Sequence, residues 1–194
     1  MLNLTQWQEI DAFFMAEGKI FQTLTRLAQS LDRAGISYVI VGGMAMAVHG
    51  FVRPTEDIDI LLTPEGLAAF QQQLVGRGFV AAFPGATRKF RDAQTGVEIE
   101  ILTSGSFPGD GKPKPVAFPD PVAVAVDYNG IKVIDLTRLI ELKLASGISG
   151  RGRLRDLADV QDLIRAFTLP VELAESLDAS VREHYVELWD DLYA

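Results

Sequence analysis

The stretch Val39–Leu62 reads VIVGGMAMAVHGFVRPTEDIDILL, and it decides the fold of the chain. It opens with an apolar, β-branched run that stops at Gly42-Gly43, which predicts a buried strand followed by a tight turn. After a polar segment, Asp57 and Asp59 alternate with isoleucines. Because the side chains of a strand alternate between its two faces, both carboxylates leave one face while the isoleucines enter the core. Two neighbouring carboxylates repel each other unless a cation lies between them, so this strand is a candidate metal site.

The order of these signals resembles the signature of the nucleotidyltransferase superfamily, which has the DNA polymerase beta-like fold. That signature is an apolar strand, Gly-Gly or Gly-Ser, roughly a dozen residues and then Asp-x-Asp. Here thirteen residues separate Gly43 from Asp57. The segment HGFVRPTEDID is most similar to the small bacterial members grouped with abortive-infection toxins and antibiotic nucleotidyltransferases. The resemblance implies an α+β (α/β) fold, with a mixed sheet, flanking helices and a C-terminal helical segment.

Length and composition limit the class of protein. The 194 residues suit a core domain with a helical appendage, and we expect a core over residues 1–135 and a helical segment over 136–194. The chain has no cysteine, so oxygen ligands or its two histidines must hold any metal. A formal charge of −8 disfavours non-specific binding of long nucleic acid. The sequence shows neither a signal peptide nor a bilayer-spanning run, which predicts a cytoplasmic protein with no membrane partner.

A second alternating stretch, Val97–Leu102, supplies the candidate for a third acidic ligand. Its sequence VEIEIL places Glu98 and Glu100 on one face of a strand and apolar residues on the other. In the resembling family the third acid lies on a strand beside the Asp-x-Asp strand. Glu100 fits that position best and Glu98 is the alternate, although the family usually has aspartate there. The alternative is a solvated strand face that carries two glutamates.

Four residues of the opening stretch are candidates for binding a nucleotide. Gly42 and Gly43 lack a Cβ, so their backbone N–H groups can approach a phosphate at the start of the next helix. Arg53 can contact a triphosphate as a charged donor, and Thr55 adds a hydroxyl. The alternatives are a tight turn without a ligand and an Arg53 that pairs with a neighbouring carboxylate.

Lys143 lies within an apolar stripe of a helix predicted from about Thr137. An ammonium group there is unfavourable unless an anion meets it. In the resembling families a lysine within a pattern like LIELKLAS faces the nucleotide phosphates, so we expect Lys143 to meet a phosphate or an active-site carboxylate. The alternatives are that it extends outward to solvent or pairs with a core carboxylate.

The remaining segments give weaker signals. Residues 1–34 are predicted to be helical, and residues 104–121 are predicted to form a long surface loop over or beside the site. Val122–Val126 and Ile131–Ile134 are predicted strands of a hairpin that turns at Asn-Gly. Near the C-terminus, Ser180 and Glu183 are predicted to form a capping box.

Together, the resemblance implies a magnesium-dependent nucleotidyltransferase of the EC 2.7.7 type. Asp57, Asp59 and Glu100 would hold two magnesium ions and carry the catalysis, with a nucleoside triphosphate as donor substrate. Its nucleoside monophosphate would pass to an acceptor hydroxyl of a small molecule, a tRNA or a protein. The alternative function is a catalytically weak or inactive nucleotide-binding protein of the same fold, which works through a protein partner as in a toxin–antitoxin pair.

Overall fold

The computed structural model describes residues 18–150 and 152–193. The chain forms two compact units. The first comprises Pro119–Ile134 and the chain up to Ser104, and the second comprises Gly105–Phe118 and the chain from Asp135 onward. The expected domain boundary after residue 135 stays a prediction. The described part of the predicted N-terminal helix is α2 (Gly18–Arg33), whereas residues 1–17 lie outside the described residues.

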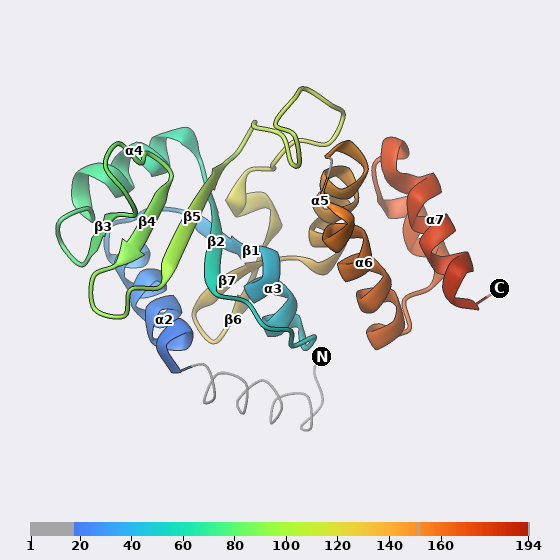
Figure 1. Ribbon diagram of the computed structural model, residues 1–194, viewed down its shortest axis with the longest axis horizontal. Coiled ribbons are helices and arrows are strands. Elements are labelled where there is room, and N and C mark those ends of the chain that lie inside the picture. The colour runs from blue at the N-terminus through green and yellow to red at the C-terminus, as the bar shows by residue number, and fades with distance from the viewer. Residues whose placement is uncertain (1–17, 151, 194) are drawn as a thin grey trace. The chain divides into compact units, whose positions relative to one another are not determined.

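A mixed sheet of seven strands forms the centre of the first unit, as the resemblance implies (Figure 1). Its spatial order is β3-β4-β5-β2-β1-β7-β6. β1 pairs antiparallel with β2, and β2 pairs parallel with β5. The strands are β1 (Tyr38–Val41), β2 (Asp57–Leu62), β3 (Phe79–Ala81), β4 (Lys89–Asp92), β5 (Glu98–Thr103), β6 (Ala125–Tyr128) and β7 (Ile131–Ile134).

Two further helices of the first unit connect its strands. α3 (Gly42–His49) follows β1 directly, so the glycine pair forms the start of a helix. α4 (Pro64–Gln73) follows β2, and the Thr63 side chain accepts a hydrogen bond of 3.0 Å from the backbone N–H of Gly66. Thr63 therefore caps α4 while Pro64 occupies its first turn, which is the favoured place for proline.

The predicted strand at Val122–Val126 is wrong over its first part. Pro121–Val124 forms a short 3-10 helix, η1, and the strand β6 begins only at Ala125. The Asp120 side chain accepts a 2.8 Å hydrogen bond from the Val122 N–H, and this local cap outweighs the β propensity of the valines. The predicted hairpin is confirmed, because Asn129 and Gly130 both have positive φ angles, 53° and 86°, as a two-residue hairpin turn requires.

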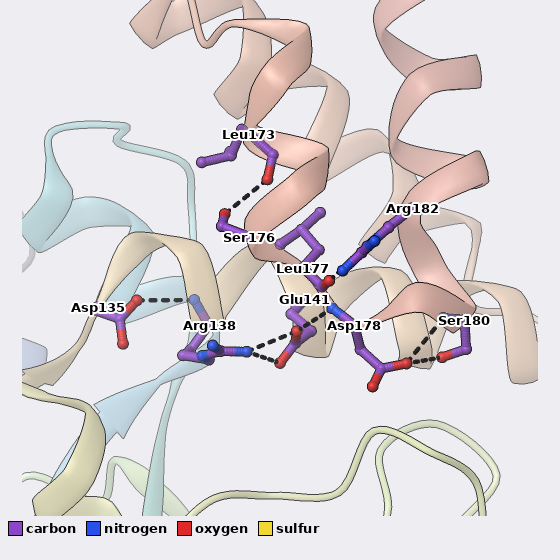
Figure 2. A network of polar contacts seen from close by, with 9 residues as sticks. All are labelled: Asp135, Arg138, Glu141, Leu173, Ser176, Leu177, Asp178, Ser180 and Arg182. Atoms are coloured by element: carbon purple, nitrogen blue, oxygen red, sulfur yellow. Dashed lines mark hydrogen bonds and ion pairs between the residues drawn. The ribbon is translucent and has the colours of Figure 1, made fainter.

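Three helices and a short 3-10 segment make up most of the second unit (Figure 1). Each helix packs against the other two. The predicted capping box at Ser180 is also wrong: the Asp178 carboxylate accepts hydrogen bonds from the backbone N–H and the hydroxyl of Ser180, at 2.9 and 2.6 Å (Figure 2). The elements are α5 (Leu136–Ser149), α6 (Leu154–Phe167), η2 (Val171–Ser176) and α7 (Ala179–Tyr193).

A buried carboxylate, Glu141, joins α5 to the start of α7. Arg138 Nη1 donates to both of its oxygens, at 2.8 and 2.7 Å, and the backbone N–H of Asp178 donates to one of them at 2.7 Å (Figure 2). A buried carboxylate is tolerated only when it is paired in this way, so this network fixes how the helices of the second unit pack. No helix among the described residues is long and apolar enough to span a bilayer.

Candidate active site

The two aspartates of β2 share one face of the sheet, as the alternation predicts. Ile58 and Ile60 are fully buried on the other face, whereas Asp57 and Asp59 are partly exposed. The core side of the strand therefore fixes the orientation of the carboxylates, because a shift of one residue would bury both acids.

The turn after β1 lies directly against this pair of carboxylates. Val41 is in register with Asp59 across the antiparallel β1–β2 pair, so Gly42 comes next to the Asp59 side chain. Gly42 has a φ angle of +63°, and a Cβ built on it would lie 2.1 Å from Asp59 Oδ2. Only glycine fits here, both for its backbone angle and for the space that the carboxylate occupies.

Gly43, Thr55 and Arg53 extend the same cluster. A Cβ on Gly43 would lie 2.9 Å from Thr55 Oγ1 and 3.5 Å from Arg53 Nη2. The Thr55 hydroxyl donates to Asp57 Oδ1 at 3.1 Å, and Arg53 Nη1 donates to the carbonyl oxygen of Pro54 at 3.3 Å. The structure thus brings a guanidinium, a hydroxyl and the glycine turn to the shared end of strands β1 and β2, where the aspartates lie.

β5 brings two more carboxylates onto this face. Because β2 and β5 are parallel and in register, Glu98 lies beside Asp57 and Glu100 beside Asp59. Each glutamate already has a cationic partner on β4: Lys89 Nζ lies 3.1 Å from Glu100 Oε2, and Arg91 Nη2 lies 2.5 Å from Glu98 Oε1. The hydrogen bond to Glu100 raises the pKa of Lys89 above its usual range.

The chemistry of the donor set fits a hard divalent cation. All the candidate ligands are carboxylate oxygens, which magnesium prefers, and the missing Cβ of Gly42 leaves room for the Asp59 carboxylate. Among residues 18–150 and 152–193, however, no three acidic or histidine side chains are gathered in a metal-binding geometry. The assignment of Asp57, Asp59 and Glu100 as metal ligands therefore stays a prediction, which the oxygen chemistry of these side chains supports.

Lys89 and Arg91 are site residues for which the sequence alone predicted no role. The signal for such a role was the alternation of the sequence, since Lys89 and Arg91 flank the buried Phe90 in a strand.

His49, which ends α3, has a packing role: its Nε2 donates to the carbonyl oxygen of Ile134 at 2.7 Å, and its Nδ1 lies 3.2 Å from the Tyr128 hydroxyl. These contacts attach the helix that begins at the glycine pair to strands β6 and β7.

Lys143 belongs to the second unit, where it is buried beside two carboxylates of α6. Its Nζ donates to Asp159 Oδ2 at 2.5 Å and to Asp156 Oδ1 at 3.4 Å. Asp156 also accepts a 2.7 Å hydrogen bond from the Ser146 hydroxyl. Of the alternatives left open by the sequence, pairing with a core carboxylate is the one observed within this unit. A role of Lys143 in nucleotide binding stays a prediction.

Comparison with a solved structure from Thermotoga maritima supports the fold. A Thermotoga maritima protein provisionally assigned as a nucleotidyltransferase superposes with a TM-score of 0.50 at 18% identity, covering 77% of this chain and 94% of that chain. A Helicobacter pylori protein with the same provisional assignment gives 0.44 at 19% identity, covering 86% of this chain and 89% of that chain. The antibiotic-resistance factor ANT(2'')-Ia gives 0.47 at 13% identity, with 88% and 91% covered.

No curated protein sequence matches the chain significantly. The family profile described as "Nucleotidyl transferase AbiEii toxin, Type IV TA system" matches residues 24–190. This range includes the glycine turn and both aspartates of β2, and it extends through α5 and α6 into α7. The chain therefore belongs to the AbiEii family of nucleotidyl transferase toxins of type IV toxin–antitoxin systems.

Proposed function

We propose that this protein transfers a nucleoside monophosphate from a nucleoside triphosphate to an acceptor hydroxyl, in a magnesium-dependent reaction. The observation that carries the proposal is the packing of the glycine turn against the aspartate pair: a Cβ on Gly42 would lie 2.1 Å from Asp59 Oδ2. Backbone N–H groups at a helix start favour phosphate, and paired carboxylates favour a divalent cation. A triphosphate with bound magnesium needs backbone N–H groups and carboxylates at the same place.

Each residue of the cluster has a defined task in this proposal. Asp57 and Asp59, with Glu100 as third ligand, would hold two magnesium ions, which when bound neutralise the triphosphate and activate the acceptor oxygen. The N–H groups of the glycine pair, the Arg53 guanidinium and the Thr55 hydroxyl bind and orient the triphosphate. Positioning of this kind supplies most of the catalysis of phosphoryl transfer.

The bond changes follow from this arrangement. The acceptor oxygen attacks the α-phosphorus in line and forms a new P–O bond, while the bond between the α-phosphorus and its bridging oxygen breaks and pyrophosphate leaves. Glu100, which is in register with Asp59, would take the proton of the acceptor hydroxyl. The net charge of −8 favours a small or cationic acceptor, such as an alcohol group of a small molecule, over a long nucleic acid.

A second function has one observation in its favour. Glu98 and Glu100 are both engaged by cations of β4, so the candidate third ligand is already neutralised. A catalytically weak nucleotide-binding protein that acts through a protein partner is compatible with such an arrangement. Transfer activity separates the two functions, since only the enzyme modifies an acceptor.

The proposed reaction is tested by the position of the label that is transferred. The purified protein is incubated with magnesium, a cell lysate and each of the four triphosphates, labelled either at the α- or at the γ-phosphorus. We expect label on an acceptor only from the α-position, and only for some of the triphosphates. Transfer from the γ-position would indicate a kinase reaction. No transfer from any triphosphate, together with tight binding of a partner protein, would support the second function.

A further inference from the structure

Two rows of charge cross the face of the sheet that carries the aspartates. In the first row Asp59 of β2 is in register with Glu100 of β5, which is in register with Lys89 of β4. In the second row Asp57, Glu98 and Arg91 follow in the same order. Residues in register on neighbouring strands lie on the same face, so each row reads acid, acid, base.

Lys89 is directed toward the candidate metal ligands. Its Nζ lies 3.1 Å from Glu100 Oε2, and the two side chains are 49% and 37% exposed. Phe90 of β4 is buried in the core, so its neighbour Lys89 lies on the opposite face of the strand, which is the aspartate face. Beyond Glu100, the carboxylates of Glu98 and Asp57 also raise the pKa of Lys89, so its ammonium group lies in the field of three acids.

We propose that Lys89 is a positioning residue, an internal counter-ion that holds Glu100 and competes with the divalent cation for that carboxylate. This inference rests on the proposed function, because it assigns Glu100 to the metal. A half-exposed ion pair is weak and is readily exchanged for a divalent cation, which attracts the same carboxylate more strongly. Lys89 thereby lowers the affinity of the site for a metal that arrives alone.

The inference predicts the direction and the scale of a change in metal affinity. Lys89→Met keeps a long apolar stem and removes the charge, which frees Glu100 for the metal. An exposed ion pair of this kind is worth about a three- to fivefold change in an equilibrium constant. We therefore expect the Kd for manganese to fall by about that factor.

Arg91→Met is the matched control, because Arg91 lies on the same strand and makes the same kind of pair with Glu98. Manganese is titrated calorimetrically into the wild-type protein and both variants, whose folding is checked by circular dichroism. We expect tighter binding in Lys89→Met and an unchanged Kd in Arg91→Met. An equal decrease of the manganese Kd in both variants would show that Lys89 acts only through its positive charge and not through Glu100, and would overturn the inference. Tightening in Arg91→Met alone would overturn it as well, and would assign the metal to Glu98.

A double-mutant cycle shows whether Lys89 acts through Glu100. In the Glu100→Gln background, Lys89→Met is expected to leave the Kd for manganese unchanged, since there is no carboxylate to release. The same three- to fivefold gain in that background would contradict the inference.

Asp57→Asn combined with Asp59→Asn tests the proposed function separately: equal manganese binding by this variant and the wild type would contradict the metal site itself. Loss of binding in that variant with no effect of Lys89→Met would contradict only the role of Lys89.

Discussion

Gly42 lies against Asp59 so closely that a methyl group on its α-carbon would be 2.1 Å from the Asp59 carboxylate oxygen. The contact joins the first residue of α3 to the third side chain of β2. The glycine turn proposed to bind phosphate and the carboxylate pair proposed to bind metal thus lie in direct contact, so a side chain on Gly42 would displace the Asp59 carboxylate.

Gly42→Ala tests this contact. The substitution must both strain a φ angle of +63° and push the Asp59 carboxylate aside. A displacement of about 1 Å at a catalytic group can lower the rate by about a hundredfold, so we expect a loss of that order in nucleotidyl transfer. The measurement is the initial rate of label transfer by the wild-type protein and by Gly42→Ala at a saturating triphosphate concentration.

Gly35→Ala is the control for backbone strain. Gly35 has nearly the same φ angle, +65°, but a Cβ there would meet nothing within 4 Å. We expect both variants to lose about 1–2 kcal/mol of unfolding free energy from the left-handed backbone alone. Only Gly42→Ala should also lose activity, and an equal loss of activity in both variants would contradict the role assigned to the contact.

The pair of Lys143 and Asp159 allows structural and nucleotide-binding roles to be separated. Lys143 is 6% exposed and Asp159 is 3% exposed, so Asp159→Ala leaves a buried ammonium group with a weakened set of partners. We expect it to lower the unfolding free energy by about 3 kcal/mol, whereas Lys143→Met with Asp159→Leu, which replaces the pair by apolar groups, should restore it. Urea denaturation measures both changes.

Activity of the apolar double variant then decides the function of Lys143. If its ammonium group binds the triphosphate, as the family resemblance implies, the folded double variant should lose about a hundredfold in transfer rate, as expected on removing one charged donor from a phosphoryl-transfer site. Wild-type activity in this stable variant would show that the lysine has only a structural role.

Two buried tyrosines predict a loss of stability at high pH. Burial raises the pKa of Tyr38 and of Tyr185 to about 12. The phenol of an unfolded chain titrates near pH 10, so the folded state retains these protons longer. The stabilisation by these tyrosines is therefore complete below about pH 10, and the unfolding free energy falls as the pH rises toward 12, by up to about 3 kcal/mol for each tyrosine.

The measurement is urea denaturation at several pH values between about 9 and 11.5, with tyrosine ionisation followed by absorbance. Tyr38→Phe and Tyr185→Phe should each reduce the alkaline loss of unfolding free energy. Tyr193→Phe removes a phenol that is 48% exposed and that contributes less than burial does to the raised pKa of Tyr185, so it should reduce the alkaline loss less than Tyr185→Phe does. A pH dependence that all three substitutions leave intact would contradict this account.

The sequence predicted most of the sheet and the part of the site that lies within one local pattern. The alternation of Asp57 and Asp59 with isoleucines determined both the strand and the face, and the glycine pair marked the turn, because these signals depend only on neighbouring residues. The family profile and the mixed sheet confirm the fold class and the resemblance.

Contacts between distant residues were less accessible to sequence analysis. The pairing of Lys89 with Glu100 depends on the register between β4 and β5, which the turn between them sets. The pairing of Lys143 with Asp159 depends on how two helices pack. The 3-10 helix at Pro121–Val124 replaced part of a predicted strand because the cap by Asp120 competes with β propensity.

We propose above all that Asp57 and Asp59 hold the metal that makes nucleotidyl transfer possible. The most direct measurement compares label transfer from α-labelled triphosphates by the wild-type protein and by Asp57→Asn combined with Asp59→Asn, with magnesium present. Both side chains are partly exposed, so the variant should fold, which thermal unfolding verifies. We predict that only the wild type labels an acceptor and that a chelator abolishes the labelling. Equal labelling by the folded double variant would contradict the account.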